Sequence, residues 1–314
     1  MRDLRIVFMG TPDFAVATLN ALMQAKYTIV GVITAPDKPA GRGRKIQKSA
    51  VKSYALEHNL NILQPTNLKS EEFITQLKSL NANLQIVVAF RMLPEIVWKM
   101  PKYGTFNLHA SLLPDYRGAA PINWAIINGE TKTGVTTFFI DEKIDTGNII
   151  LKEEVKIGEN EIVGELHDKL MKVGSELVVK TVKQIEENNV ITTKQRAEEG
   201  KLAPKIYNET CQINWNDNLN NIYNLIRGLN PYPTAWTTLI NNEEEIQVKI
   251  FDVEKEIIPH QHKAGTVITS KKEIKVAVKD GFLKINSLKL SGKRKMDSKS
   301  LLNGFTFHEN AIMR

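Results

Sequence analysis

The order of hydrophobic patterns along the chain is the strongest constraint on its fold. The first half alternates short apolar runs with segments that carry apolar residues every three or four positions. Such runs are typical of strands buried on both faces, and such segments are typical of the helices that cover them. We expect strands at 4–9, 29–34, 84–89, 105–109 and 135–140, and helices starting at 11 and spanning 49–59, 71–80, 120–128 and 161–187. This order predicts an α/β fold with a Rossmann-like, doubly wound, mostly parallel sheet.

The pattern changes in the second half of the chain. Residues 188–208 show no periodicity, and short alternating segments follow at 247–253, 265–269, 274–278 and 282–290, separated by glycine or charged turns. These segments predict a small antiparallel barrel or sandwich. A length of 314 residues is consistent with two domains. We therefore expect a first domain at 1–188, a linker at 189–207 and a second domain at 208–314.

Composition excludes several classes of protein. No apolar stretch approaches eighteen residues, so we expect no membrane span. The start of the chain is too short and too charged to form a signal peptide before the first strand. Cys211 is the only cysteine, which excludes an intrachain disulfide and a cysteine-based zinc site. These features favour a protein of the reducing cytoplasm.

The formal net charge is +7, and the excess lies in two clusters. Residues 36–52 contain six basic side chains and one acidic side chain, and residues 271–296 contain nine basic and two acidic ones. Two interpretations remain open on these counts. The clusters are either ordinary solvated surfaces or an electrostatic footprint for phosphates.

Several familiar motifs are missing. The first strand is followed by Gly10-Thr11-Pro12-Asp13, which lacks the glycine pattern of dinucleotide-binding turns and places a carboxylate where a pyrophosphate would lie. The chain contains no phosphate-binding loop of the Gly-x-x-x-x-Gly-Lys type and no Gly-x-Ser-x-Gly motif. His260 and His262 have no third ligand nearby in the sequence, so we expect no metal site.

The densest polar cluster follows the strand expected at 105–109. Asn107 and His109 are two residues apart, so their side chains leave the same face at the carboxyl end of the strand. An amide can stabilise an oxyanion, and an imidazole can move protons near neutral pH. Asp145, in a turn with Thr146 and Gly147, is the best candidate to orient His109. A structural histidine–asparagine pair is the alternative interpretation.

Nothing in the sequence supplies a base to Ser111, the nearest hydroxyl. We therefore favour direct transfer of an acyl group to an amine over a covalent acyl-enzyme.

Three motifs point to a known family. Residues 107–114 read Asn-Leu-His-Ala-Ser-Leu-Leu-Pro, residues 117–122 read Arg-Gly-Ala-Ala-Pro-Ile, and residues 144–147 read Ile-Asp-Thr-Gly. With these motifs the chain resembles the 10-formyltetrahydrofolate-dependent formyltransferases. Further motifs at 36–45, 203–206, 226–233 and 292–296 resemble the members of that family that act on methionyl initiator tRNA.

The resemblance implies roles for individual residues. Asn107, His109 and Asp145 match the catalytic trio of the family. The segments that line the folate pocket match Ser111, Leu112, Leu113 and Pro114, together with Phe90, Arg91, Met92 and Leu93. The tRNA contacts match Arg42, Arg44 and Lys45 in the first basic cluster, and Lys293, Arg294 and Lys295 in the second. The second domain is similar to the OB-like barrel that holds the tRNA in this family.

The implied reaction moves a formyl group from 10-formyltetrahydrofolate to the α-amino group of methionine on initiator tRNA, which supports translation initiation. The resemblance implies a monomer that needs no metal and no membrane. One alternative is a formyltransferase acting on an aminosugar nucleotide, which has no need of the first basic cluster or of a basic second domain. The other is an RNA-binding module without catalysis, which the intact Asn107, His109 and Asp145 disfavour.

Overall fold

The computed structural model describes residues 1–40, 45–196 and 200–314, and Arg42 and Arg44 lie outside this described part. The chain forms two compact units. The first unit contains residues 1–118, 133–155 and 167–202, and the second contains 119–132, 156–166 and 203–314. Helix α5 (Pro121–Ile127) therefore groups with the second unit. The domain boundaries at 188 and 208 stay a prediction.

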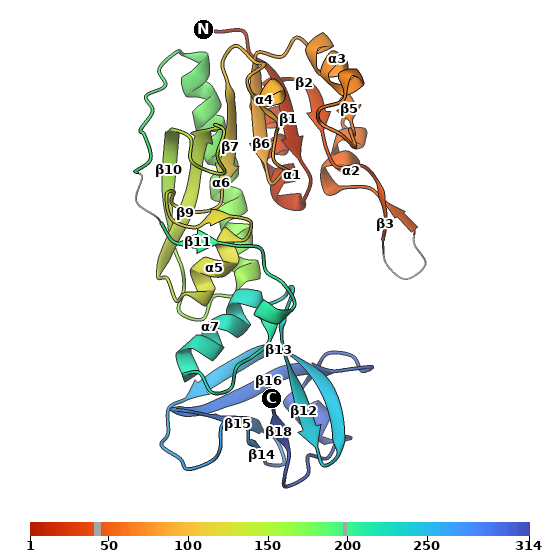
Figure 1. Ribbon diagram of the computed structural model, residues 1–314, viewed down its shortest axis with the longest axis vertical. Helices are drawn as coiled ribbons and strands as arrows, with labels where there is room; N and C mark the ends of the chain where they lie inside the picture. Colours follow the sequence, from red (N-terminus) through yellow and green to blue (C-terminus); the bar gives the residue numbers. More distant parts are fainter. Residues whose placement is uncertain (41–44, 197–199) are drawn as a thin grey trace. The chain divides into compact units, whose positions relative to one another are not determined.

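A seven-stranded sheet forms the centre of the first unit, in the order β10-β9-β7-β6-β1-β2-β5 (Figure 1). Its strands are β1 (Arg5–Gly10), β2 (Thr28–Ile33), β5 (Ile62–Leu63), β6 (Leu84–Val88), β7 (Thr105–His109), β9 (Lys132–Phe139) and β10 (Ile149–Lys156). The strands from β5 to β7 pair in parallel, whereas β9 is antiparallel to β7. The prediction of a mostly parallel sheet is confirmed, although the sequence pattern did not indicate β10.

Helices cover both faces of this sheet (Figure 1). They are α1 (Asp13–Gln24), α2 (Ala50–Glu57), α3 (Glu71–Ser79), α4 (Glu95–Trp98) and α6 (Val163–Glu186). Helices α3 and α4 pack on the face that carries Val7, Met9 and Val87. Helix α6 covers the opposite face, where Gly174 permits a close approach to the side chain of Leu108.

The strand order reverses beside β1. The chain runs from β1 to β2 and β5 on one side, and then returns to place β6 and β7 on the other side. Open α/β sheets bind their ligands at the carboxyl ends of the strands beside such a reversal. The last residue of β7 is His109, so the predicted catalytic cluster lies at that edge of the sheet.

Two short two-stranded sheets accompany the central sheet. Strands β3 (Lys38–Ala40) and β4 (Lys45–Gln47) form an antiparallel hairpin, so the backbone of Lys45 belongs to β4. Strand β8 (Arg117–Gly118) pairs with β11 (Leu202–Ala203). The pairing of β8 with β11 shows that part of the linker expected at 189–207 packs on the loop after the predicted catalytic cluster.

The second unit is built on an antiparallel sheet in the order β14-β15-β16-β13-β12-β18, with β17 paired to β16. Its strands are β12 (Ala235–Asn241), β13 (Glu244–Glu256), β14 (Val267–Thr269), β15 (Ile274–Val278), β16 (Gly281–Leu290), β17 (Met296–Asp297) and β18 (Ile312–Met313). A bridge between Thr266 and Ile312 joins the two edges, so the sheet is a nearly closed barrel rather than a sandwich.

Helices accompany this barrel. They are α7 (Leu219–Leu229), α8 (Ser298–Leu302) and the short 3₁₀ helix η1 (Glu209–Cys211). Helix α7 packs against β13 and α5, and its apolar side chains join the barrel core. The core therefore contains one helix that was not among the elements expected from the sequence.

Candidate active site

Asn107 and His109 leave the same face of β7, opposite Leu108. The imidazole of His109 is almost fully buried, whereas Asn107 is half-buried. In the part of the chain that the structure describes, the side-chain amide of Asn107 makes no hydrogen bond with the protein. The amide is therefore available to donate to a carbonyl oxygen that reaches this edge.

The two ring nitrogens of His109 have different surroundings. Nε2 lies 2.8 Å from the backbone oxygen of Tyr116, and a carbonyl oxygen only accepts, so Nε2 carries a proton. Nδ1 lies 3.8 Å from Oδ2 of Asp145, and both side chains are largely buried. Nδ1 is thus the ring nitrogen that can exchange a proton, and it does so beside a carboxylate.

Asp145 is held in the loop between β9 and β10. Its Oδ2 accepts from the backbone N–H of Gly118 at 3.0 Å, and its own φ of 56° lies in the left-handed region. Gly147 is required two residues later, because a Cβ there would lie 1.6 Å from the backbone oxygen of Phe139. The structure thus brings Asp145 to His109 on a tight turn.

Residues 111–114, expected at the folate pocket, have two fully buried and two half-buried side chains. Ser111 is fully buried, and its hydroxyl donates to the backbone oxygen of Asp115 at 2.6 Å, so no base activates it. Leu113 is also fully buried, beside Phe138, while Leu112 and Pro114 are half-buried. Side-chain contacts with a ligand are therefore restricted to the two half-buried members.

The second segment expected at the folate pocket follows β6. Leu93 packs into the core beneath α4, whereas Met92 is 68% exposed and Phe90 is half-buried. The guanidinium of Arg91 donates to the backbone oxygens of Thr66, at 2.9 Å, and of Pro65. Arg91 therefore ties this loop to the loop after β5.

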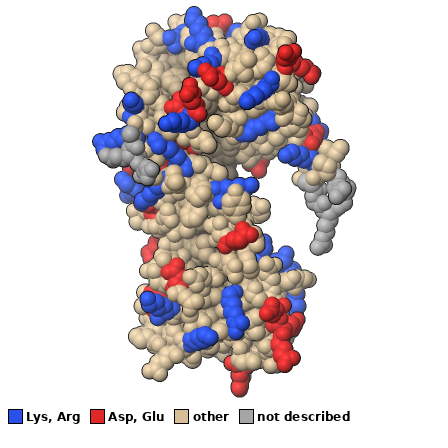
Figure 2. Space-filling view, viewed as in Figure 1, with Lys and Arg blue, Asp and Glu red and all other residues tan. Residues whose placement is uncertain are grey.

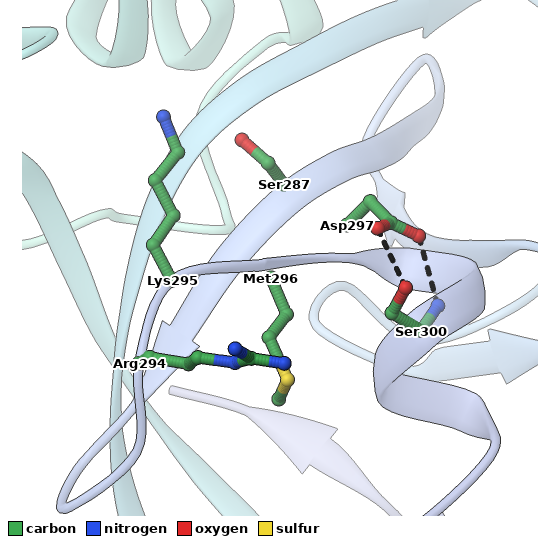
Figure 3. Close-up of a pocket in the computed structure, with 6 residues that line it drawn as sticks. All are labelled: Ser287, Arg294, Lys295, Met296, Asp297 and Ser300. Carbon is green, nitrogen blue, oxygen red and sulfur yellow. Dashed lines mark hydrogen bonds between the residues drawn. The ribbon is translucent and has the colours of Figure 1, made fainter.

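A pocket of about 370 Å³ in the second unit contains two of the predicted tRNA contacts (Figure 3). Its lining is Ser287, Arg294, Lys295, Met296, Asp297 and Ser300. Among the described residues, the hydroxyl of Ser287 is buried without a hydrogen-bond partner. The ammonium of Lys295 lies 4.4 Å from the centre of the Phe251 ring, and that of Lys293 lies 5.3 Å from the Phe305 ring.

Two further lysines face each other on the strands next to this pocket. Lys249 on β13 pairs with Lys289 on β16, and both side chains are exposed. Like charges directly opposite each other destabilise a sheet, so this pair concentrates positive charge at a local cost in stability. Sequence reasoning missed this pair because register was not known. Lys and Arg are mixed with Asp and Glu over the visible face of each unit (Figure 2). The pair of Lys249 and Lys289 therefore marks a local positive site that the overall charge distribution does not reveal.

Other possibilities from the sequence can be placed. Among residues 1–40, 45–196 and 200–314, no group of three His, Cys, Asp or Glu side chains is arranged to hold a metal ion. His260 bonds the backbone oxygen of Gly281 at 2.8 Å and packs on Phe282. No helix within the described ranges is long and apolar enough to cross a membrane.

A free amide and a histidine–carboxylate pair at the carboxyl edge of a doubly wound sheet are suited to the transfer of small acyl groups. Family models match twice, as "Formyl transferase" over residues 4–182 and as "Formyl transferase, C-terminal domain" over residues 205–306. The chain belongs to the formyl transferase family.

Curated relatives match the whole length. A protein of Flavobacterium psychrophilum named methionyl-tRNA formyltransferase is 59% identical, with all of both chains covered. One of the same name from Bacteroides thetaiotaomicron is 56% identical, over 99% of this chain and 98% of its own. Identity therefore extends across both units.

Solved structures share the fold. WlaRD, described as a sugar 3N-formyl transferase, matches with a TM-score of 0.66 and 23% identity over 94% of this chain and all of its own. HypX of Aquifex aeolicus, solved in complex with tetrahydrofolic acid, matches with a TM-score of 0.64 and 18% identity over 96% of this chain and 47% of its own. At these identities the likeness concerns the fold alone.

Proposed function

We propose that the chain transfers the formyl group of 10-formyltetrahydrofolate to the α-amino group of methionine on initiator tRNA, and so supports translation initiation. The observation that carries the proposal is the 59% identity to a methionyl-tRNA formyltransferase over the full length of both chains. Because the identity extends over both units, the proposal includes catalysis by the first unit and acceptor binding by the second. The proposed protein works as a cytoplasmic monomer, with the folate as substrate and without a metal.

In the proposed reaction the amine attacks the formyl carbon and forms a tetrahedral intermediate. The amide of Asn107 donates to the oxygen as negative charge develops there. The pair of His109 and Asp145 takes a proton from the amine and returns one to N10 of the folate as the carbon–nitrogen bond breaks. His109 exchanges this proton at Nδ1, because Nε2 is bonded to the oxygen of Tyr116.

The folate is proposed to contact the two loops beside this centre. Leu112 and Pro114 contribute from one loop, and Phe90, Arg91 and Met92 contribute from the other. The buried side chains of Ser111, Leu113 and Leu93 shape these loops from below. They therefore act through backbone position rather than by direct side-chain contact.

The acceptor tRNA is proposed to bind basic residues of both units. Lys293, Arg294 and Lys295 contribute from the second unit, and the pocket beside them supplies the Ser287 hydroxyl as a hydrogen-bond donor for a phosphate oxygen. Arg42, Arg44 and Lys45 contribute from the first unit in this proposal. Lys249 and Lys289 extend the second-unit surface.

An acceptor competition tests the proposal. The purified protein receives 10-formyltetrahydrofolate with initiator Met-tRNA and with aminosugar nucleotides in parallel reactions, and formylated products are separated and counted. We expect formyl-methionyl-tRNA alone. Formylation of the sugar nucleotides in preference to the tRNA would replace the proposal with an aminosugar formyltransferase, and tRNA binding without any transfer would replace it with an RNA-binding module.

A further inference from the structure

The segment from residue 193 to residue 202 lies between the two family models, so neither model covers it. We call residues 193–202 the connecting segment, of which the structure describes 193–196 and 200–202. Thr193 exchanges two backbone hydrogen bonds with Ile149, at 2.8 and 2.9 Å. The segment is therefore attached to the first unit at the start of β10.

Among the described residues of the connecting segment, Gln195 has the most deeply buried side chain. It is only 8% exposed. Its Nε2 donates to the backbone oxygens of Asp145, at 2.9 Å, and of Gly147, at 2.8 Å. Its Oε1 accepts from Nη2 and Nε of Arg117, at 2.6 and 3.2 Å. Gln195 thus spans the whole turn that carries the catalytic carboxylate.

Arg117 closes the same arrangement from the other side. Its Nε also donates to the backbone oxygen of Asp145 at 3.1 Å. Asp145 has a positive φ, which a residue with a side chain keeps only when its surroundings hold it there. Gln195 and Arg117 supply those surroundings.

Residues 200–202 of the connecting segment hold the backbone of Tyr116, whose oxygen bonds His109. The backbone N–H of Tyr116 donates to the oxygen of Lys201 at 2.5 Å, and the N–H of Lys201 donates to the Asp115 carboxylate at 3.0 Å. Gly200 lies so close that a Cβ would be 2.4 Å from the oxygen of Pro114. The oxygen of Tyr116, which accepts from Nε2 of His109, is thereby fixed.

We propose that the connecting segment positions the catalytic pair. Gln195, with Arg117, sets Asp145 beside Nδ1 of His109, and the backbone of Lys201 sets the Tyr116 oxygen at Nε2. Gln195 is a positioning residue, since its polar atoms bond the turn and not the reacting groups. The kinetic part of this inference rests on the proposed function, because it is measured as formyl transfer.

A double-mutant cycle separates positioning from a merely structural role. Gln195→Met keeps the size of the side chain and removes its hydrogen bonds. In the otherwise unchanged chain we expect kcat to fall by roughly 10- to 100-fold, as small displacements of catalytic groups do, with KM for both substrates unchanged. In the Asp145→Ala background, Gln195→Met should lower kcat no further, because the residue through which it acts is gone.

Two companion variants sharpen the cycle. Gln195→Glu retains an acceptor for Arg117 but turns a carboxylate toward the carbonyl oxygens of Asp145 and Gly147. Its kcat should therefore fall as much as that of Gln195→Met. This second variant keeps the test usable if Gln195→Met folds poorly. Gln76→Met, on the exposed face of α3, is the matched control and should behave like the unchanged chain. Equal losses of kcat in both backgrounds of the cycle would overturn the proposal.

A second readout needs no turnover. Nitrogen-15 NMR of labelled histidines reports the ring environment of His109, whose signals are assigned by their loss in His109→Gln. These signals should change in Gln195→Met and Gln195→Glu and stay in place in Gln76→Met. If the unchanged chain formylates no tRNA while the signals change, the proposed function fails and the positioning role stands. If it formylates tRNA and the signals do not change, the positioning role fails alone.

Discussion

At the scale of single residues, the asymmetry of His109 decides how the site can work. A ring nitrogen bonded to a backbone oxygen keeps one tautomer, and the other nitrogen is left to exchange protons beside Asp145. Asn107, two residues earlier, keeps its amide free within the described structure. Proton transfer and oxyanion stabilisation are therefore assigned to different side chains on one short strand.

Removing these groups should affect turnover much more than folding. We expect Asn107→Ala, His109→Ala and Asp145→Ala each to lower kcat by about 100-fold or more, since an oxyanion donor or a proton carrier is typically worth that much. The measurement is single-turnover formyl transfer to Met-tRNA, with circular dichroism as the test of folding. Glu142→Gln, exposed in the same loop as Asp145, is the control and should keep full activity. Near-normal turnover in all three alanine variants would exclude this edge of the sheet as the active site.

The only cysteine offers an independent test of the second unit. Cys211 is 2% exposed, and burial raises the pKa of its thiol. We expect a thiol-specific reagent at mildly alkaline pH to leave the native protein unmodified and to label one thiol in concentrated guanidinium chloride. A raised pKa in the folded state also means that stability declines once the pH exceeds the ordinary value of about 8.5. Rapid labelling of the native protein would show that the barrel core does not bury this thiol.

At the scale of elements, the sequence indicated those whose pattern is set locally. The strand at 105–109 was predicted to the residue, and the helix predicted at 161–187 spans Val163–Glu186. Strand β10 was missed because its centre, Lys152 to Glu154, faces solvent and shows no alternation. Helix α7 was missed although its apolar residues at 219, 222, 223, 226 and 229 have the spacing of an amphipathic helix. Its asparagines lie outside this stripe, which the barrel core buries.

The site was predictable to a similar extent. Asn107, His109 and Asp145 could be proposed because each lies in a recognisable strand or turn, and the structure places Asp145 beside His109. Their catalytic roles stay a prediction. The contacts of Gln195 and Lys201 join residues from 48 to 86 positions apart, and no local pattern records them. The segment therefore had the pattern of a linker, and only the tertiary structure connects it with the catalytic pair.

Helix α7 contains a buried charge whose removal should be costly. Arg227 is 7% exposed, and its guanidinium donates to the oxygens of Glu161, at 3.0 Å, and Asn224, at 2.8 Å. Burial lowers the pKa of Arg227. Arg227→Met leaves these acceptors unpaired, so we expect a loss of about 2 kcal/mol in the free energy of unfolding.

Denaturant titration followed by circular dichroism checks this expectation. Lys299→Met, at an exposed position of α8, is the control and should unfold at the same denaturant concentration as the unchanged chain. An unfolding midpoint of Arg227→Met equal to that of the control would mean that water already satisfies these oxygens.

At the scale of the whole molecule, the residues proposed for chemistry and those proposed for acceptor binding form different sets. The proposed reacting groups lie on β7 and on the loop after β9, all within the first unit. The exposed basic residues beside β16 and β17 belong to the second unit. Changes in the second set should therefore alter how tRNA binds without altering how the folate binds.

Salt dependence tests this separation. Phosphate contacts release counterions, so KM for Met-tRNA should rise steeply with salt. Replacing Lys293, Arg294 and Lys295 together with glutamine should raise that KM and reduce its salt slope by about one for each phosphate that is no longer neutralised, while KM for the folate stays the same. The control replaces Lys271, Lys272 and Lys279, which are exposed in the same unit and carry the same total charge. Identical slopes in the two triple variants would assign the effect to net charge alone.

The pairing of β8 with β11 has a practical consequence for recombining members of this family. To exchange second units between enzymes with different acceptors, one would place the fusion point directly after α6, where the sequence has the pattern of a linker. In a chimera joined there, the residues at positions 195 and 201 would come from the second enzyme. They would then contact the turn of Asp145 and the backbone of Tyr116 in the first enzyme, and could disturb both. A crossover placed after Ala203 keeps that segment with its native sheet. The grafted α7 must then match α5 and Glu161 of the first enzyme, which it contacts in the second unit.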